Sequence, residues 1–214
     1  MNCKICLNDC VVSRKTLIKR TDHEILFNLI PEKATVLDLG CGDGKLLEQL
    51  KNKHITAQGI EIDSQLVRSC IKKGISVIQQ DLDNGLADFQ DNSFDFVILN
   101  KTLQATYKPL LVLKEAVRVG NHVLVSFPNF GYYQIRLQLF FSGSMPKSKD
   151  LPYEWYDTPN IHLVTIADFE RFCKNNNFKI EKKIFYHEGG LIQFPVWVNL
   201  FSPYALFVLS RQSN

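Results

Sequence analysis

The sequence has 214 residues, of which 45% are hydrophobic and 22% charged, a globular balance that favours one domain with a substantial core. Its 25 basic and 22 acidic residues leave a formal net charge of +3, so no strong nucleic-acid footprint is expected. The longest apolar stretch, residues 194–209, is interrupted by Pro195, Asn199 and Pro203, and it is a poor candidate for a membrane span. The N-terminus has no long apolar run, which argues against a secretion signal and for a cytoplasmic protein.

The six cysteines are not expected to form a disulfide framework, because no secretion signal precedes them. Cys3, Cys6 and Cys10 have the spacing C-x2-C-x3-C, which suggests a zinc or iron–sulfur clip, but the fourth ligand of a closed zinc site is not nearby. We therefore expect no bound metal. Residues 1–19 are expected to form a flexible leader, and residues 20–214 a single domain.

The first elements are a helix and a strand that ends in a glycine-rich turn. Apolar residues at helical spacing predict a helix from Thr21 or Asp22 to Pro31. Residues 36–44 then read VLDLGCGDG, in which strand formers run into three glycines, and a helical pattern follows. Glycine reaches backbone angles closed to other residues and lets a ligand lie against the main chain. The stretch predicts a strand, a tight ligand-binding turn and a helix start.

The next two predicted strands each lead to an acidic residue. The second strand, residues 55–61, ends at Glu61, about 20 residues beyond the turn, where an acid can accept both hydroxyls of a ribose. Asp63 then caps a helix that closes at residue 74. The third strand, residues 75–78, precedes Asp81, whose carboxylate can accept a hydrogen bond from an adenine amino group. Three such turns at three successive strand ends predict a site for a nucleotide-type ligand.

A dinucleotide is the first alternative for this ligand. Its fingerprint is G-x-G-x-x-G, whereas this turn is G-x-G-x-G and contains Asp43, which would repel a pyrophosphate. We therefore expect a ligand without phosphates. A nicotinamide-dependent reductase is correspondingly disfavoured.

Alternation of strands and helices continues through the middle of the chain. Residues 94–99 form a fourth strand, and a helix starts at Pro109 and ends at Gly120, before a fifth strand at residues 122–127. This order predicts a parallel sheet with right-handed crossovers. Asn100 and Thr102 follow the fourth strand, at the edge where open α/β sheets bind ligands.

The chain changes character after the fifth strand. A helix around residues 133–140 leads into a Pro- and aromatic-rich segment at 145–162, and an insertion of this kind at about 128–164 is usually a lid or a binding loop. Thr165 has the spacing of a capping box and opens a further helix. Residues 178–186 and 204–209 are the last two predicted strands.

The D-x-G-x-G-x-G turn, the acid of the second strand and the Asp after the third strand resemble those of the class I S-adenosylmethionine (SAM) dependent methyltransferases. The resemblance implies a Rossmann-like, doubly wound and mostly parallel seven-stranded sheet with an antiparallel last strand. It also implies that SAM, or S-adenosylhomocysteine, binds with its amino-acid portion and methyl end at the glycine turn, its ribose at Glu61 and its adenine at Asp81 and Leu82. The implied cofactor-binding residues are Asp38, Gly40, Cys41, Gly42, Gly44, Glu61, Ile62, Asp81, Leu82, Asn100 and Thr102.

Other blocks resemble one family more closely, the methionine biosynthesis protein MetW family. The most specific are residues 125–131, VSFPNFG, and residues 151–162, LPYEWYDTPNIH, and the match spans about Arg20 to Arg211. This resemblance implies a SAM-binding protein of methionine biosynthesis that acts with a homoserine O-acyltransferase in homoserine activation. It does not establish a methyl acceptor. The alternative is an active SAM-dependent methyltransferase acting on a small molecule.

A general base, if an acceptor needs one, would come from the aromatic segment. His162 titrates nearest neutral pH, and Tyr156 and Asp157 are further candidates. His162 is also explained by a hydrogen bond from the loop to the backbone. The sequence leaves three roles open for the aromatic residues Tyr153, Trp155 and Tyr156. They cover a substrate, form a protein docking surface, or pack on the core.

Overall fold

The computed structural model describes residues 22–148, 152–192 and 196–212. The predicted leader, with Cys3, Cys6 and Cys10, lies outside the described residues. The strands are β1 (Thr35–Leu39), β2 (Thr56–Glu61), β3 (Val77–Gln79), β4 (Phe94–Asn100), β5 (Gly120–Pro128), β6 (Phe178–His187), β7 (Gly190–Leu191) and β8 (Tyr204–Arg211). The helices are α1 (Asp22–Leu29), α2 (Lys45–Lys51), α3 (Ser64–Lys72), α4 (Pro109–Val119), α5 (Tyr133–Ser142), α6 (Ile166–Asn175) and α7 (Val198–Phe201), with two 3-10 turns, η1 (Leu82–Asn84) and η2 (Leu103–Ala105).

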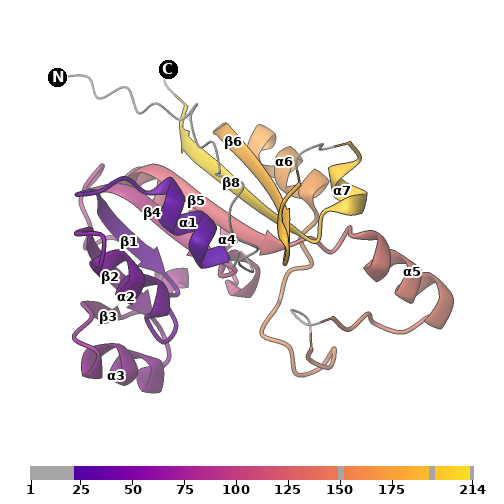
Figure 1. Cartoon of the computed structure of the whole chain (residues 1–214), viewed down its shortest axis with the longest axis horizontal. Coiled ribbons are helices and arrows are strands. Elements are labelled where there is room, and N and C mark those ends of the chain that lie inside the picture. Colours follow the sequence, from indigo (N-terminus) through magenta and orange to yellow (C-terminus); the bar gives the residue numbers. More distant parts are fainter. Residues whose placement is uncertain (1–21, 149–151, 193–195, 213–214) are drawn as a thin grey trace.

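The described strands form one sheet in the order β3-β2-β1-β4-β5-β8-β6-β7 (Figure 1). Neighbours from β3 to β5 pair in parallel, and β8 runs antiparallel to both β5 and β6. The predicted doubly wound, mostly parallel sheet with an antiparallel last strand is confirmed. The sheet gains an eighth strand, because the chain turns back at Gly189 and Gly190 and pairs β7 with the end of β6.

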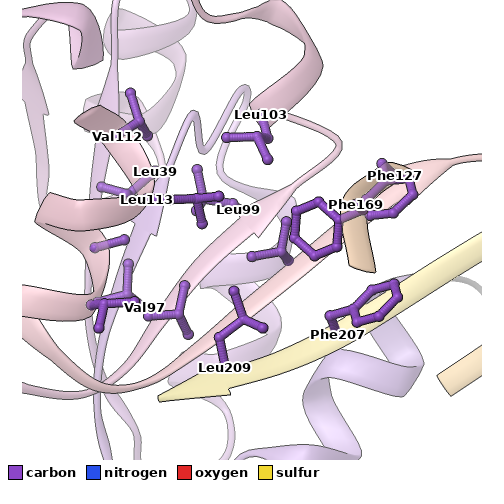
Figure 2. Close-up of a cluster of buried hydrophobic side chains, with 14 of the residues drawn as sticks. Leu39, Val97, Leu99, Leu103, Val112, Leu113, Phe127, Phe169, Phe207 and Leu209 are labelled. Atoms are coloured by element: carbon purple, nitrogen blue, oxygen red, sulfur yellow. The ribbon is translucent and has the colours of Figure 1, made fainter. Parts of the chain in front are cut away.

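Two apolar layers enclose the sheet, because side chains along a strand alternate between its faces. Leu37 and Leu39 of β1 belong to a core covered by α4 and α6, part of which Figure 2 shows with Phe127, Phe169 and Phe207 side by side. Val36 belongs to the core on the other face, under α1, α2 and α3. Both faces of the central strands are therefore buried, as their nearly continuous apolar sequence predicts.

The predicted helix caps are present. The Asp63 carboxylate accepts the amide N–H groups of Gln65 and Leu66 at the start of α3. Thr165 Oγ1 accepts the Asp168 N–H at 3.1 Å, which caps α6, and it donates to the Asp168 carboxylate at 2.6 Å, a bond between side chains in place of the backbone bond of a full capping box. The short helix α7 was not predicted.

The insertion after β5 begins at Asn129, whose side chain is fully buried. Its Nδ2 donates to the carbonyl oxygens of Asn199 and Ser202, and its Oδ1 accepts the N–H groups of Gly131 and Ile166. One side chain thus joins the end of β5 to the start of α6 and to α7 with its C-terminal cap, just before β8. Figure 1 shows α5 reaching out beyond the carboxyl end of β5, with the following segment returning toward the sheet.

Candidate functional site

The glycine turn lies between β1 and α2. Gly40, Gly42 and Gly44 have φ of 77°, 58° and 77°, in the left-handed region that favours glycine. A Cβ at Gly40 would lie 2.6 Å from the Thr102 side chain and one at Gly44 would lie 2.6 Å from that of Ile75, whereas one at Gly42 would meet no described atom within 4 Å. The turn is therefore tightly packed at two of its glycines and open at the middle one.

Glu61 ends β2 beside this turn and is almost fully buried. Its Oε2 accepts the Gly42 N–H at 2.9 Å, and its Oε1 accepts the N–H groups of Ile62 at 2.9 Å and Asp63 at 3.0 Å. A carboxylate offers about four acceptor positions, so these bonds hold the side chain and leave about one position for a ligand hydroxyl. Glu61 thus fixes the glycine turn against β2, and its ribose-binding role stays a prediction.

Asp38 lies in β1, in register with Gly59 of β2 and Ile98 of β4. Its side chain is 3% exposed, and among the described residues its Oδ1 has no hydrogen-bond partner. Burial, and then the charge of Glu61, raise the pKa of Asp38 to about 7. An unpaired buried carboxyl oxygen is costly, and a cationic ammonium group would supply the missing partner.

A cavity of about 300 Å³ opens at the carboxyl edge of the parallel strands. Its volume is at the lower end of the range for small-molecule sites, roughly 300–1,000 Å³. Its walls come from the ends of β1 to β4 and from η2. The lining residues are Gly40, Ile60, Glu61, Ile62, Gln80, Asp81, Leu82, Asp83, Lys101, Thr102, Ala105, Thr106 and Tyr107.

The structure brings together part of the predicted cofactor site. The predicted residues that line the cavity are Gly40, Glu61, Ile62, Asp81, Leu82 and Thr102. Those that lie outside its wall are Asp38, Cys41, Gly42, Gly44 and Asn100. The Asn100 Oδ1 instead accepts the Ser126 hydroxyl at 2.5 Å, which joins β4 to β5.

The adenine end of the predicted site is built around η1. The Asp81 carboxylate accepts the Asp83 N–H at 2.9 Å and so caps this short turn. Asp83 in turn accepts the N–H groups of Tyr107 and Lys108, which brings the segment after η2 against η1. Ile62 is exposed and supplies an apolar patch to the cavity wall.

Lys101 lies in the cavity wall where β4 ends. Its φ is 55°, an uncommon value for a residue with a side chain. Its Nζ lies 2.8 Å from the Asp22 carboxylate and 4.8 Å from the centre of the Tyr204 ring. The first residue of α1 is thereby held beside the cavity.

His23, the next residue of α1, has its pKa lowered by burial, an effect that the charge of Asp22 opposes. The charges of Lys101, Asp43 and Lys45 also act on it. The start of α1 therefore lies near both the glycine turn and the end of β4.

The three candidate bases do not line the cavity. The His162 Nε2 donates to the Thr106 carbonyl oxygen at 3.0 Å, and the His162 N–H donates to the Gln104 carbonyl oxygen at 3.0 Å. Tyr156 and Asp157 are exposed. His162 therefore makes the loop-to-backbone contact that the sequence left open as its alternative role.

Sequence reasoning missed seven residues of the cavity wall, which are Ile60, Gln80, Asp83, Lys101, Ala105, Thr106 and Tyr107. Lys101 lies between two predicted residues, Asn100 and Thr102, but the sequence gives no signal that places Lys101 rather than Asn100 in the wall. No sequence signal indicated Tyr107, because it lies in the wall through the hydrogen bond of its N–H to Asp83, which is far away in sequence.

No group of three or more His, Cys, Asp or Glu side chains in the described part of the chain is placed to hold a metal ion. No described helix combines the length and apolar character needed to cross a membrane.

The strand order and the cavity at the carboxyl edge define the class I SAM-dependent methyltransferase fold. A solved SAM-dependent methyltransferase of Methanosarcina mazei aligns with a TM-score of 0.65 at 18% sequence identity, covering 89% of this chain and 98% of that one. This likeness concerns the fold.

The sequence comparisons identify the family. The family model described as Methionine biosynthesis protein MetW matches residues 20–209, and the chain belongs to this family. A bifunctional methionine biosynthesis protein MetXA/MetW of Rhodopirellula baltica is 38% identical over 205 residues, which are 90% of this chain and 33% of that protein. The chain thus spans about a third of the length of this relative. A demethylmenaquinone methyltransferase of Bacillus licheniformis is 31% identical over 149 residues, 64% of each chain.

Proposed function

We propose that the protein binds SAM, or its demethylated product, and adjusts a homoserine O-acyltransferase in methionine biosynthesis. The observation that carries the proposal is the cavity at the ends of β2, β3 and β4, lined by Glu61 and Asp81, in a chain of the MetW family. The partner is suggested by the R. baltica relative, whose name joins MetW to MetXA in one protein.

The residues of the site suit an adenosine joined to an amino acid. Asp38 and Gly42 lie outside the cavity wall but flank Gly40, which lines it, and we propose that the unpaired oxygen of Asp38 meets the ligand's ammonium group at this end, next to the open backbone at Gly42. Asp43 in the turn disfavours a pyrophosphate. Glu61 accepts one ribose hydroxyl, while Asp81 and Ile62 lie at the adenine end.

Regulation by this ligand requires that SAM bind one state of the protein more tightly than another. We propose that the Lys101–Asp22 ion pair distinguishes two such states, formed in one and broken in the other. The ion pair between Lys101 and Asp22 holds the start of α1 against the end of β4. A ligand whose amino-acid end reaches the end of β4 meets both charges. SAM then serves as a signal of methionine supply, read by a protein of the same pathway.

An active methyltransferase is the second candidate, favoured by the fold and by the B. licheniformis relative. Bound SAM would supply a reactive methyl group on its sulfonium. The chain's residues would then align an acceptor and exclude water. The contacts of His162 with Gln104 and Thr106 give this candidate less support, since the predicted base donates to the backbone and does not itself line the cavity.

The cytoplasm is the compartment that we propose for either function. Cys41, Cys70 and Cys173 are free and buried. Unpaired thiols suit a reducing compartment.

The deciding experiment is an acyltransfer assay with the homoserine O-acyltransferase of the same organism. Its rate is measured alone, with this protein, and with this protein and SAM, while light scattering follows complex formation. We expect a complex and a rate that changes when SAM is added. Absence of both would overturn the proposal. In parallel, S-adenosylhomocysteine release from SAM in a metabolite extract tests the second candidate, and no release would count against it.

A further inference from the structure

Helix α5 exposes most of its apolar side chains. Ile135 is its one buried residue, whereas Leu137, Leu139, Phe140 and Phe141 are exposed, the two Phe residues by 79% each. We call these four exposed residues the α5 surface. A helix that is apolar on several sides is normally buried against something. Figure 1 shows that α5 projects from the sheet, and the described residues leave the α5 surface uncovered.

A second exposed aromatic group follows in residues 152–162, the aromatic loop. Trp155 and Tyr156 are each 72% exposed, with their rings 5.6 Å apart, and Tyr153 is also exposed. Lys147, just after α5, forms an ion pair with Glu154 of the loop. Fully buried aromatic side chains each cover about 150–250 Å², so Phe140, Phe141, Trp155 and Tyr156 together leave on the order of 600 Å² exposed. Exposed apolar area on this scale marks an interaction site.

The composition of these segments favours a protein partner over a membrane. Membrane-surface helices carry Lys and Arg on the polar face. The only charged residue of α5 is Arg136, which donates to the Gly131 carbonyl oxygen, and the aromatic loop carries Glu154 and Asp157. Aromatic residues with few charges are typical of the centre of protein interfaces.

The aromatic loop is also connected to the cavity. His162, at its end, bonds to the carbonyl oxygens of Gln104 and Thr106, and Thr106 and its neighbours Ala105 and Tyr107 line the cavity wall. A ligand that moves this wall therefore acts on the segment that carries Trp155 and Tyr156. This is the connection that a ligand-dependent docking surface requires.

We propose that the α5 surface and the aromatic loop together form the docking site for a MetXA-type homoserine O-acyltransferase, an inference that rests on the function proposed above. The R. baltica relative places a MetW-like part and a MetXA-like part in one protein, which favours this occupant over a second copy of the chain. The aromatic loop contacts the cavity wall through His162, and no residue of the proposed docking site lines the cavity.

The test uses the full chain and the acyltransferase of the same organism. The dissociation constant of the complex is measured by calorimetry for wild type, for the double variant Phe140→Ser/Phe141→Ser, and for Trp155→Ser. We expect the double change to weaken binding by at least about 30-fold and the single change by about tenfold, the scale of central aromatic residues at interfaces. The control is Ile71→Ser, which removes a 61% exposed apolar side chain on α3, and binding within about twofold of wild type is expected.

The outcomes separate the two proposals. A wild-type complex that responds to SAM, with equal affinity for wild type and both surface variants, overturns the docking site and leaves the function standing. No wild-type complex overturns both. Thermal unfolding is measured for each variant to check that it is folded. We expect unfolding temperatures close to that of wild type, because the replaced side chains are exposed. The double variant could instead lose homodimer formation, or binding to phosphatidylglycerol vesicles, while it still binds the acyltransferase. Either result would also overturn the docking site.

Discussion

Asp38 combines full burial with an incomplete set of partners. Its pKa of about 7 in the folded protein lies above the ordinary value of 3.8 because burial, followed by the charge of Glu61, disfavours the ionised form. The protonated form is therefore favoured in the native state. The contribution of protonated Asp38 to the free energy of unfolding is fully present below about pH 4. This contribution is lost as the pH rises from about 4 to about 7, and it changes little above pH 7.

Ligand binding should reverse this preference, because an ammonium group stabilises the ionised carboxylate. We expect SAM binding at pH 6 to release a proton and SAM affinity to rise between pH 5.5 and 7. Calorimetry in two buffers of different ionisation enthalpy measures the release. Asp38→Asn should abolish it. His23→Gln is the control, because His23 also titrates near the site, and this variant should still release a proton when SAM binds. If proton release were lost in His23→Gln and kept in Asp38→Asn, the proton would come from His23.

Glu61 offers a second residue-level prediction. Glu61→Ala should weaken SAM binding by about 1.5–3 kcal/mol, the scale of a hydrogen bond to a charged group. It should also lower stability, because three backbone N–H groups lose their acceptor. Asp63→Ala is a matched control that removes the cap of α3, at a cost of about 1 kcal/mol in stability, with no loss of SAM affinity. Unchanged SAM affinity in Glu61→Ala would refute the ribose assignment.

Individual residues were predictable where their position in an element fixes their role. Glu61 and Asp81 follow parallel strands, so they meet at one edge of the sheet whatever surrounds them. Asn100 was expected in the cavity wall on the same grounds, but Lys101 occupies that place. The positive φ of Lys101 redirects the chain at this point, and local sequence does not encode that turn.

At the scale of elements, η2 links the cavity to the aromatic loop through one histidine. His162→Ala removes the side-chain bond to Thr106, with an expected loss of about 0.5–1.5 kcal/mol in stability. We expect faster amide hydrogen exchange in residues 103–107 and a weaker effect of SAM on acyltransferase binding. Tyr156→Phe, which keeps the aromatic surface, should do neither. Unchanged exchange and an unchanged SAM effect in His162→Ala would contradict the linkage.

The elements themselves were largely predictable, because hydrophobic period and caps are local signals. The capped starts of α3 and α6 agree with the sequence, and α4 begins at Pro109 and ends before Gly120 as its end signals indicate. The two-residue strand β7 and the four-residue α7 were missed, since elements this short are formed by the neighbours they pack against.

At the scale of the whole molecule, the effects of SAM and of the acyltransferase must be reciprocal. If SAM tightens the complex by some factor, the complex must bind SAM more tightly by the same factor. We expect a factor of about 5–150, the usual range of coupling between two sites. Titrating SAM into the free protein and into the complex measures it. Two unequal factors would mean that the binding scheme contains a further state.

The sequence predicted the order of the longer strands and helices and three strand ends at one edge of the sheet where we expect a ligand, because glycine geometry, caps and periodicity act over a few residues. Three further features became visible only in the folded structure: Lys101 rather than Asn100 lines the cavity, the described residues leave the α5 surface uncovered, and His162 contacts Thr106, 56 residues away. These outcomes depend on contacts between distant segments, and no local pattern specifies which of those segments meet.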